Sequence, residues 1–186
     1  MNKLRKGMMK IFVALSISLL PMNSKAQSLI IDNLKDVKAD WTPFSDQVMG
    51  DISKVNFYEL QEEDFSFYRL EGNVSTENNG GFIQFRSDVN FKKTDFSGIR
   101  IKARGNNEEY FLHIRTAVTV LPWDYYGASF KVTADWQWIE IPFSNFKKTS
   151  FFLPGKVKSS KIKTIGVVAY GKDFFAQVDI AGVELY

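Results

Sequence analysis

Apolar and polar residues alternate in short stretches along most of this chain, and no stretch has the spacing of an amphipathic helix. Gly98–Arg104 alternates most cleanly, with isoleucine and alanine on one side and arginine and lysine on the other. The pattern predicts strands at Ser28–Asp32, Val55–Leu60, Phe65–Val74, Gly81–Arg86, Gly98–Arg104, Tyr110–Thr116, Ala128–Val132, Trp136–Ile141, Lys163–Tyr170 and Phe174–Leu185. About ten short strands joined by Gly, Asn and Asp turns predict an all-β, antiparallel β-sandwich.

Two segments interrupt the alternation in informative ways. Glu77–Gly80 ends in Asn-Gly before a new alternating run, which predicts a hairpin between Phe65–Val74 and Gly81–Arg86. Trp41–Ser53 combines a proline, a glycine, two carboxylates and apolar residues, with neither strand nor helix periodicity. We therefore expect Trp41–Ser53 to be either a structural plug at one end of the sandwich or part of a site.

The first 26 residues have the features of a secretory signal peptide. Residues 1–10 are basic, Ile11–Leu20 is apolar, and Ser24-Lys25-Ala26 offers small residues for cleavage. The apolar run is shorter than the roughly 20 residues of a membrane-spanning helix. We expect cleavage after Ala26, a periplasmic or secreted protein without stable membrane insertion, and a single domain over residues 27–186.

Removal of this leader changes the charge balance. The 186 residues carry 24 Lys and Arg against 21 Asp and Glu. Five of the basic residues lie in the leader, so the rest of the chain has 24 − 5 = 19 basic and 21 acidic residues. A slightly acidic domain without a basic block does not favour nucleic acid as a partner. The chain has no cysteine, which excludes disulfides, thiol catalysis and a lipid-anchored amino terminus.

Six motifs, in the right order, resemble the complex I intermediate-associated protein 30 family over Trp41–Glu184. The opening motif holds Trp41, Asp46, Met49, Gly50 and Ser53. Leu70–Val74 with Gly80, Gly81 and Phe82 is similar to the family's second element, and Arg104-Gly105 with Tyr110, Trp138–Phe146, Ile162–Gly166 and Val178–Val183 follow. This chain has Asp51 where the family usually has a second glycine.

The resemblance implies a galactose-binding-domain-like jelly roll of two antiparallel sheets, one of them concave. The best-known members of the family are non-enzymatic assembly factors for respiratory complex I. An assembly or chaperone-like role is therefore one alternative for this chain, although a signal peptide would direct it away from the site of that assembly.

The concave sheet is the first candidate binding surface. Strand alternation points seven polar or aromatic side chains away from the core, and we expect one sheet to present them together: Gln84, Arg86, Arg104, His113, Arg115, Trp138 and Glu140. Hydrogen-bond donors with an aromatic ring suit a sugar. The alternative is an ordinary solvated face with ion pairs across the strands.

The loop Leu121–Gly127 is the second candidate, because Trp123, Tyr125 and Tyr126 are large aromatics in a predicted loop. Exposed aromatics of this kind suit glycan or protein contacts. The alternative is that they fold back and cap the end of the sandwich.

Signs of catalysis and of cofactor binding are weak. His113 is the single histidine, which rules out a metal site built from several histidines, and we expect no cofactor. Asp46 and Asp51 are a speculative calcium pair. Asp46, Asp51, Asp124 and Glu140 offer carboxylates for glycoside hydrolysis, but the sequence selects no pair. The sequence thus favours a non-catalytic domain that binds a protein or glycan, with a carbohydrate-active enzyme as an alternative.

Overall fold

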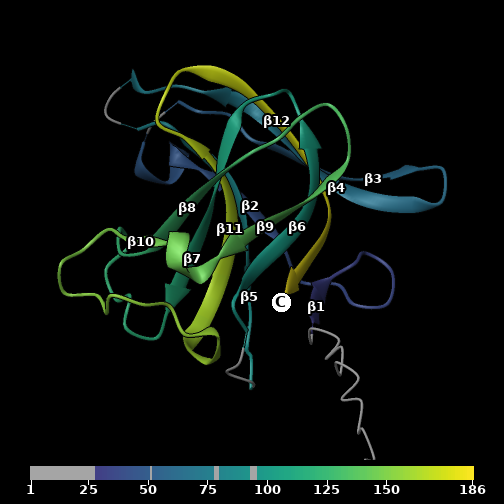
Figure 1. Ribbon diagram of the computed structural model, residues 1–186. Helices are drawn as coiled ribbons and strands as arrows, with labels where there is room; N and C mark the ends of the chain where they lie inside the picture. The colour runs from purple at the N-terminus through teal and green to yellow at the C-terminus, as the bar shows by residue number, and fades with distance from the viewer. Residues whose placement is uncertain (1–27, 51, 78–79, 93–95) are drawn as a thin grey trace, which may run out of the picture.

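The computed structural model describes residues 28–50, 52–77, 80–92 and 96–186, which form two antiparallel sheets packed face to face (Figure 1). The expected signal peptide lies outside these residues. Sheet A runs in the order β3-β4-β12-β6-β9, with β1 paired to β12. Its strands are β1 (Leu29–Asp32), β3 (Asn56–Glu62), β4 (Phe65–Val74), β6 (Gly98–Gly105), β9 (Gln137–Pro142) and β12 (Phe174–Leu185).

Sheet B runs in the order β10-β8-β7-β11-β5-β2. Its strands are β2 (Thr42–Ser45), β5 (Phe82–Asp88), β7 (Glu109–Thr116), β8 (Tyr126–Lys131), β10 (Lys147–Lys148) and β11 (Ile162–Tyr170). Short 3-10 turns lie between strands at Asp46–Met49, Phe143–Asn145 and Ser159–Lys161. In the described part of the chain, no helix is long and apolar enough to cross a membrane.

The core lies between the sheets and follows from strand alternation. In β7 the residues Tyr110, Leu112 and Ile114 are fully buried, while the intervening residues face outward. Central β11 adds Ile165, Val167 and Ala169 to the same core. Alternation in the sequence therefore predicted correctly which face of β7 is buried.

The predicted antiparallel β-sandwich is confirmed, and Phe65–Val74 and Phe174–Leu185 are strands with the predicted bounds. The predicted Asn-Gly hairpin is wrong. β4 pairs with β3 and β12 in sheet A, whereas β5 pairs with β11 and β2 in sheet B. The turn between β4 and β5 therefore carries the chain from one sheet to the other.

The expectation that Trp41–Ser53 contains no strand is also wrong, because Thr42–Ser45 forms β2 on the edge of sheet B. Proline is tolerated there because an edge strand leaves some N–H positions unpaired. The strand runs directly into the 3-10 turn Asp46–Met49, which ends at Gly50 with a φ of 90°. Only glycine adopts such a φ without strain, which explains the Met-Gly sequence at this point.

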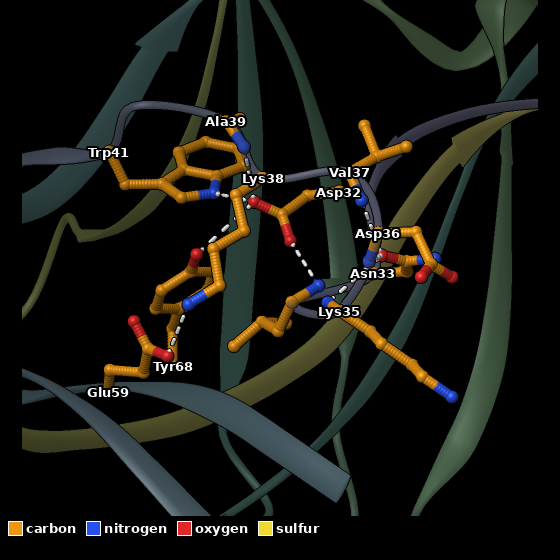
Figure 2. Close-up of polar contacts among 11 residues, drawn as sticks. Asp32, Asn33, Lys35, Asp36, Val37, Lys38, Ala39, Trp41, Glu59 and Tyr68 are labelled. Carbon is orange, nitrogen blue, oxygen red and sulfur yellow. Dashed lines mark hydrogen bonds and ion pairs between the residues drawn. The ribbon is translucent and has the colours of Figure 1, made fainter.

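Asp32 connects β1 to the start of β2 (Figure 2). Its buried carboxylate accepts hydrogen bonds from the backbone N–H groups of Leu34 and Ala39, from Trp41 Nε1–H at 2.8 Å and from the Tyr68 hydroxyl at 3.3 Å. Trp41 also packs edge-on against Phe85 of sheet B, with ring centroids 5.0 Å apart. Trp41 is therefore a structural contact between the two sheets.

Candidate functional site

A groove of about 690 Å³ lies over the outer face of sheet B. Strands β2, β5, β7 and β11 supply its base, and the loop before β8 and the turn before β5 supply its walls. Its lining residues are Phe44, Gly80, Gly81, Phe82, Gln84, Arg86, His113, Arg115, Pro122, Trp123, Tyr125, Thr164, Gly166, Val168, Tyr170 and Gly171.

Gly166 lies in the central strand β11 under the groove. Strand register places it directly between Arg86 of β5 and His113 of β7. Adjacent strands lie about 4.8 Å apart, so the backbones of Arg86 and His113 are separated by roughly 10 Å across a residue without a side chain. A Cβ at position 166 would stand 3.2 Å from Gln84 Oε1. The glycine therefore adds no side chain between these two polar residues, and a larger residue would have to displace the Gln84 amide.

Aromatic rings line one side of this floor. Tyr125 stacks on His113 with ring centroids 3.9 Å apart, and Tyr170 meets His113 edge-on at 5.4 Å. Burial lowers the pKa of His113 to about 4, so its imidazole is neutral at neutral pH. Burial, and after it the nearby Tyr125 hydroxyl, raises the pKa of Tyr170 to about 12. This side of the groove is therefore uncharged and aromatic.

Arg115 shapes the loop that carries Trp123. Its guanidinium donates to the backbone carbonyls of Thr119 at 2.9 Å and Leu121 at 2.8 Å. Thr149 fixes the other end of the loop, where its hydroxyl donates to the Trp123 carbonyl at 3.1 Å. The Trp123 side chain remains 66% exposed at the groove rim. The loop thus holds a large aromatic ring in solvent beside the groove.

Asp46 shapes the opposite wall through the turn before β5. Its buried carboxylate accepts hydrogen bonds from Ser53, from Gly81 N–H at 2.6 Å and from Phe82 N–H at 3.3 Å. Gly81 has a φ of 115°, which again requires glycine. Phe82 then packs edge-on against Phe44 of β2, with ring centroids 6.0 Å apart.

The opening motif therefore acts on the groove indirectly. Asp46 and Ser53 hold the wall, while β2 presents Phe44. Asp51 and the side chain of Met49 lie outside the described residues.

The structure brings together only part of the predicted polar face. Gln84, Arg86, His113 and Arg115 line the groove, and Trp123 and Tyr125 of the predicted aromatic loop join them. The two candidate sites inferred separately from the sequence are thus one surface. Tyr126 is an exception, because its ring is buried in the core and its hydroxyl donates to the Pro154 carbonyl.

Arg104, Trp138 and Glu140 were wrongly expected on the same face. They belong to β6 and β9 of sheet A, on the far side of the sandwich. Arg104 is held in ion pairs with Asp179 and Glu62, at 2.9 and 2.8 Å. Alternation predicted correctly that these side chains point outward, but it does not indicate which sheet a strand joins. The outer face of sheet A carries ion pairs across its strands. This is the ordinary solvated face that we considered as the alternative to a binding surface.

Of the carboxylates considered for calcium or for catalysis, Asp51 lies outside the described residues, and the described ones, Asp46, Asp124 and Glu140, do not belong to the groove lining. All four hydrogen bonds described for Asp46 come from protein donors, and Asp124 is buried outside the lining. Across residues 28–50, 52–77, 80–92 and 96–186, no group of three or more His, Cys, Asp or Glu side chains is placed to hold a metal ion.

Sequence reasoning missed Phe44, Thr164, Gly166 and Tyr170 as groove residues. Alternation in Lys163–Tyr170 already separates Thr164, Gly166 and Tyr170 from the buried Ile165, Val167 and Ala169. A glycine and a tyrosine on the same outward face of one strand were a usable indication of a ligand surface. Phe44 was missed because its strand was not predicted.

Comparison with solved structures shows carbohydrate-binding modules with this fold. The family 11 carbohydrate-binding module of a cellulosomal cellulase of Clostridium thermocellum is 16% identical, with a TM-score of 0.68 over 86% of this chain and 94% of the module. The same organism's family 11 module in complex with a β-1,3-1,4-mixed-linked tetrasaccharide is 17% identical, with a TM-score of 0.66 over 85% and 94%.

A family 30 module from a cellulosomal cellulase of the same organism is 11% identical, with a TM-score of 0.60 over 85% of this chain and 97% of the module. At these identities the likeness concerns the fold. No match was found among curated protein sequences. The model of one sequence family matches residues 32–177, which is most of the chain. The resemblance found in the motifs is therefore confirmed, and the chain belongs to the Complex I intermediate-associated protein 30 (CIA30) family.

Proposed function

We propose that this chain is an exported, non-catalytic glycan-binding domain whose ligand lies in the groove of sheet B. One observation carries the proposal: the groove combines an exposed tryptophan at its rim with tyrosines, arginines and an amide along its base. Aromatic rings pack against the apolar face of a sugar, and forked polar side chains bind its hydroxyls.

The composition of the groove supports this assignment. Its 690 Å³ volume lies within the common range for ligand sites. The fold shared with carbohydrate-binding modules supports it as well. The basic and apolar leader supports export. Among the described lining residues there is no carboxylate to serve as an acid or nucleophile, which favours binding over hydrolysis.

Substitution of the rim tryptophan tests the proposal. We expect Trp123→Ala to weaken binding of the recognised glycan by about tenfold, because the sugar loses the packing of a large ring against its apolar face, and about 1.4 kcal/mol corresponds to tenfold in affinity. Isothermal titration calorimetry of the mature chain against a panel of soluble oligosaccharides and polysaccharides measures the change.

Trp138→Ala is the matched control, since it removes an equally large ring that is 47% exposed on sheet A. Equal weakening by both substitutions, or no binding to any glycan of the panel, contradicts the proposal.

A protein partner is the second candidate function, in line with the assembly role that the family name indicates. The observation that favours it lies outside the groove, where Phe151 and Phe152 are 89% and 93% exposed in one loop. Exposed apolar pairs of this kind suit protein contacts. Specific partner capture that survives Trp123→Ala and is lost in a Phe151→Ser, Phe152→Ser double variant would favour this candidate over glycan binding.

A further inference from the structure

The arginines that the structure describes differ in their partners between the two sheets. Arg69, Arg100 and Arg104 lie on sheet A, and each forms an ion pair with a carboxylate at 2.6 to 2.9 Å. Arg86 and Arg115 lie on sheet B and line the groove. Among the described residues, neither of these two has a carboxylate partner within 4.0 Å.

The contacts of the two groove arginines leave hydrogen-bonding capacity unused. Arg86 lies over the Phe44 ring, with its guanidinium carbon 4.7 Å from the ring centroid. Arg115 uses one guanidinium nitrogen to hold the Thr119 and Leu121 carbonyls. A guanidinium has five N–H donors in a planar fork, and that fork matches a carboxylate or sulfate.

Two acids of the same sheet face stand at the ends of strands. Asp88 follows Arg86 by two residues at the end of β5, and Glu109 begins β7 opposite Lys131 of β8. Neither belongs to the groove lining. The lining therefore carries two arginines, a neutral histidine and no described carboxylate.

We infer that the groove selects acidic glycans, with a carboxylate or sulfate group of the ligand bound by Arg86 and Arg115. This inference rests on the proposed glycan-binding function and adds the class of ligand. An unpaired guanidinium in a partly enclosed groove favours a ligand that supplies the missing negative charge. Gly166 adds no side chain between Arg86 and His113, and Tyr125 and Trp123 line the same groove, where their rings can contact an acidic sugar bound at Arg86.

Matched pairs of polysaccharides, charged and neutral, distinguish the effect of the ligand's charge from that of its sugar backbone. The mature chain is titrated with polygalacturonate and its fully methyl-esterified form, and with dextran sulfate and dextran, at low and at physiological salt. We expect one charged member to bind at least tenfold more tightly than its neutral counterpart, with the preference reduced by salt. The first pair tests a carboxylate and the second a sulfate.

Arg86→Gln is the informative variant, because Arg86 makes no described hydrogen bond that holds a loop. We expect it to weaken binding of the charged glycan by about 10- to 100-fold, since hydrogen bonds to charged groups are the stronger class. The neutral glycan, which can lose only hydroxyl contacts with Arg86, should be weakened much less. Arg100→Gln makes the same change of charge on sheet A and should leave both affinities unchanged.

The outcomes distinguish the two proposals. Equal binding of charged and neutral members overturns the inference about acidity and leaves glycan binding standing. Equal weakening by Arg86→Gln and Arg100→Gln also overturns it, because the effect would then follow net charge. Binding to none of these polysaccharides, nor to any other glycan of the panel, overturns the proposed function as well.

Discussion

At the scale of single residues, the same amino-acid type has different roles on the two sheets. Arg104 on sheet A is fixed by Asp179 and Glu62, while Arg86 on sheet B lies on a phenylalanine ring without a described carboxylate partner. Trp41 is buried and hydrogen-bonded to Asp32, while Trp123 is exposed at the groove. The hydrogen bonds and ion pairs that each side chain makes within the protein therefore decide whether it is structural or available to a ligand.

His113 leads to a prediction about pH. Its pKa is about 4 in the folded protein against 6.5 for the unperturbed group, so the unfolded chain binds a proton first as pH falls. The stabilising contribution of neutral His113 is complete above pH 6.5 and is lost as pH falls toward 4. Between pH 7 and pH 5 we expect it to remove about 2 kcal/mol from the free energy of unfolding.

Urea unfolding of the wild type and of His113→Phe at these two pH values measures this contribution. The variant keeps a ring against Tyr125 and should lose less stability at pH 5, because its position no longer titrates. An equal loss in both proteins would show that the ring of His113 is not responsible.

At the scale of elements, the groove depends on how β11 lies between β5 and β7. Thr164, Gly166 and Tyr170 of β11 face the groove, and the register with Arg86 and His113 sets the distance between the polar groups. Sequence alternation predicted the outward faces of β5 and β7. It did not reveal that β11 lies between them, because the register of strands distant in sequence depends on the packed sandwich.

Filling the floor tests the role of β11. We expect Gly166→Val to lower glycan affinity by tenfold or more, because its methyl groups would occupy the space between Arg86 and His113. The nearest atom is the flexible end of Gln84, and valine is favoured in strands, so the thermal midpoint should change little.

Calorimetry of glycan binding and thermal unfolding measured together separate the two effects. Gly155→Ala is the control, because nothing lies within 4 Å of a Cβ at that position. If the Gly166→Val protein is folded and binds the glycan normally, the ligand does not lie over Gly166, which contradicts the proposed site.

At the scale of the whole molecule, the Asp32 carboxylate joins β1 of sheet A to the entry of β2 in sheet B. We expect Asp32→Ala to lower the free energy of unfolding by about 3–5 kcal/mol, because it leaves buried donors of Leu34, Ala39 and Trp41 without their acceptor.

Urea denaturation measures the loss, and Asp36→Ala, at an exposed position of the same loop, is the control. A change below 1 kcal/mol in Asp32→Ala would contradict this role of the carboxylate. Because the site residues described for the groove lie on sheet B, a folded Asp32→Ala protein should still bind its glycan.

The sequence by itself determined the all-β class, most strand positions, the buried face of the strands β5, β6, β7 and β9, and the family. These properties follow from local alternation and from motif order, which a single chain displays directly. The tertiary structure decided which sheet each strand joined. It thereby separated Arg104, Trp138 and Glu140 from Arg86, His113 and Arg115, and it joined the aromatic loop to the groove. The physical reason is that the pleat fixes side-chain direction within a strand, whereas pairing and crossover between the sheets depend on contacts far apart in the sequence.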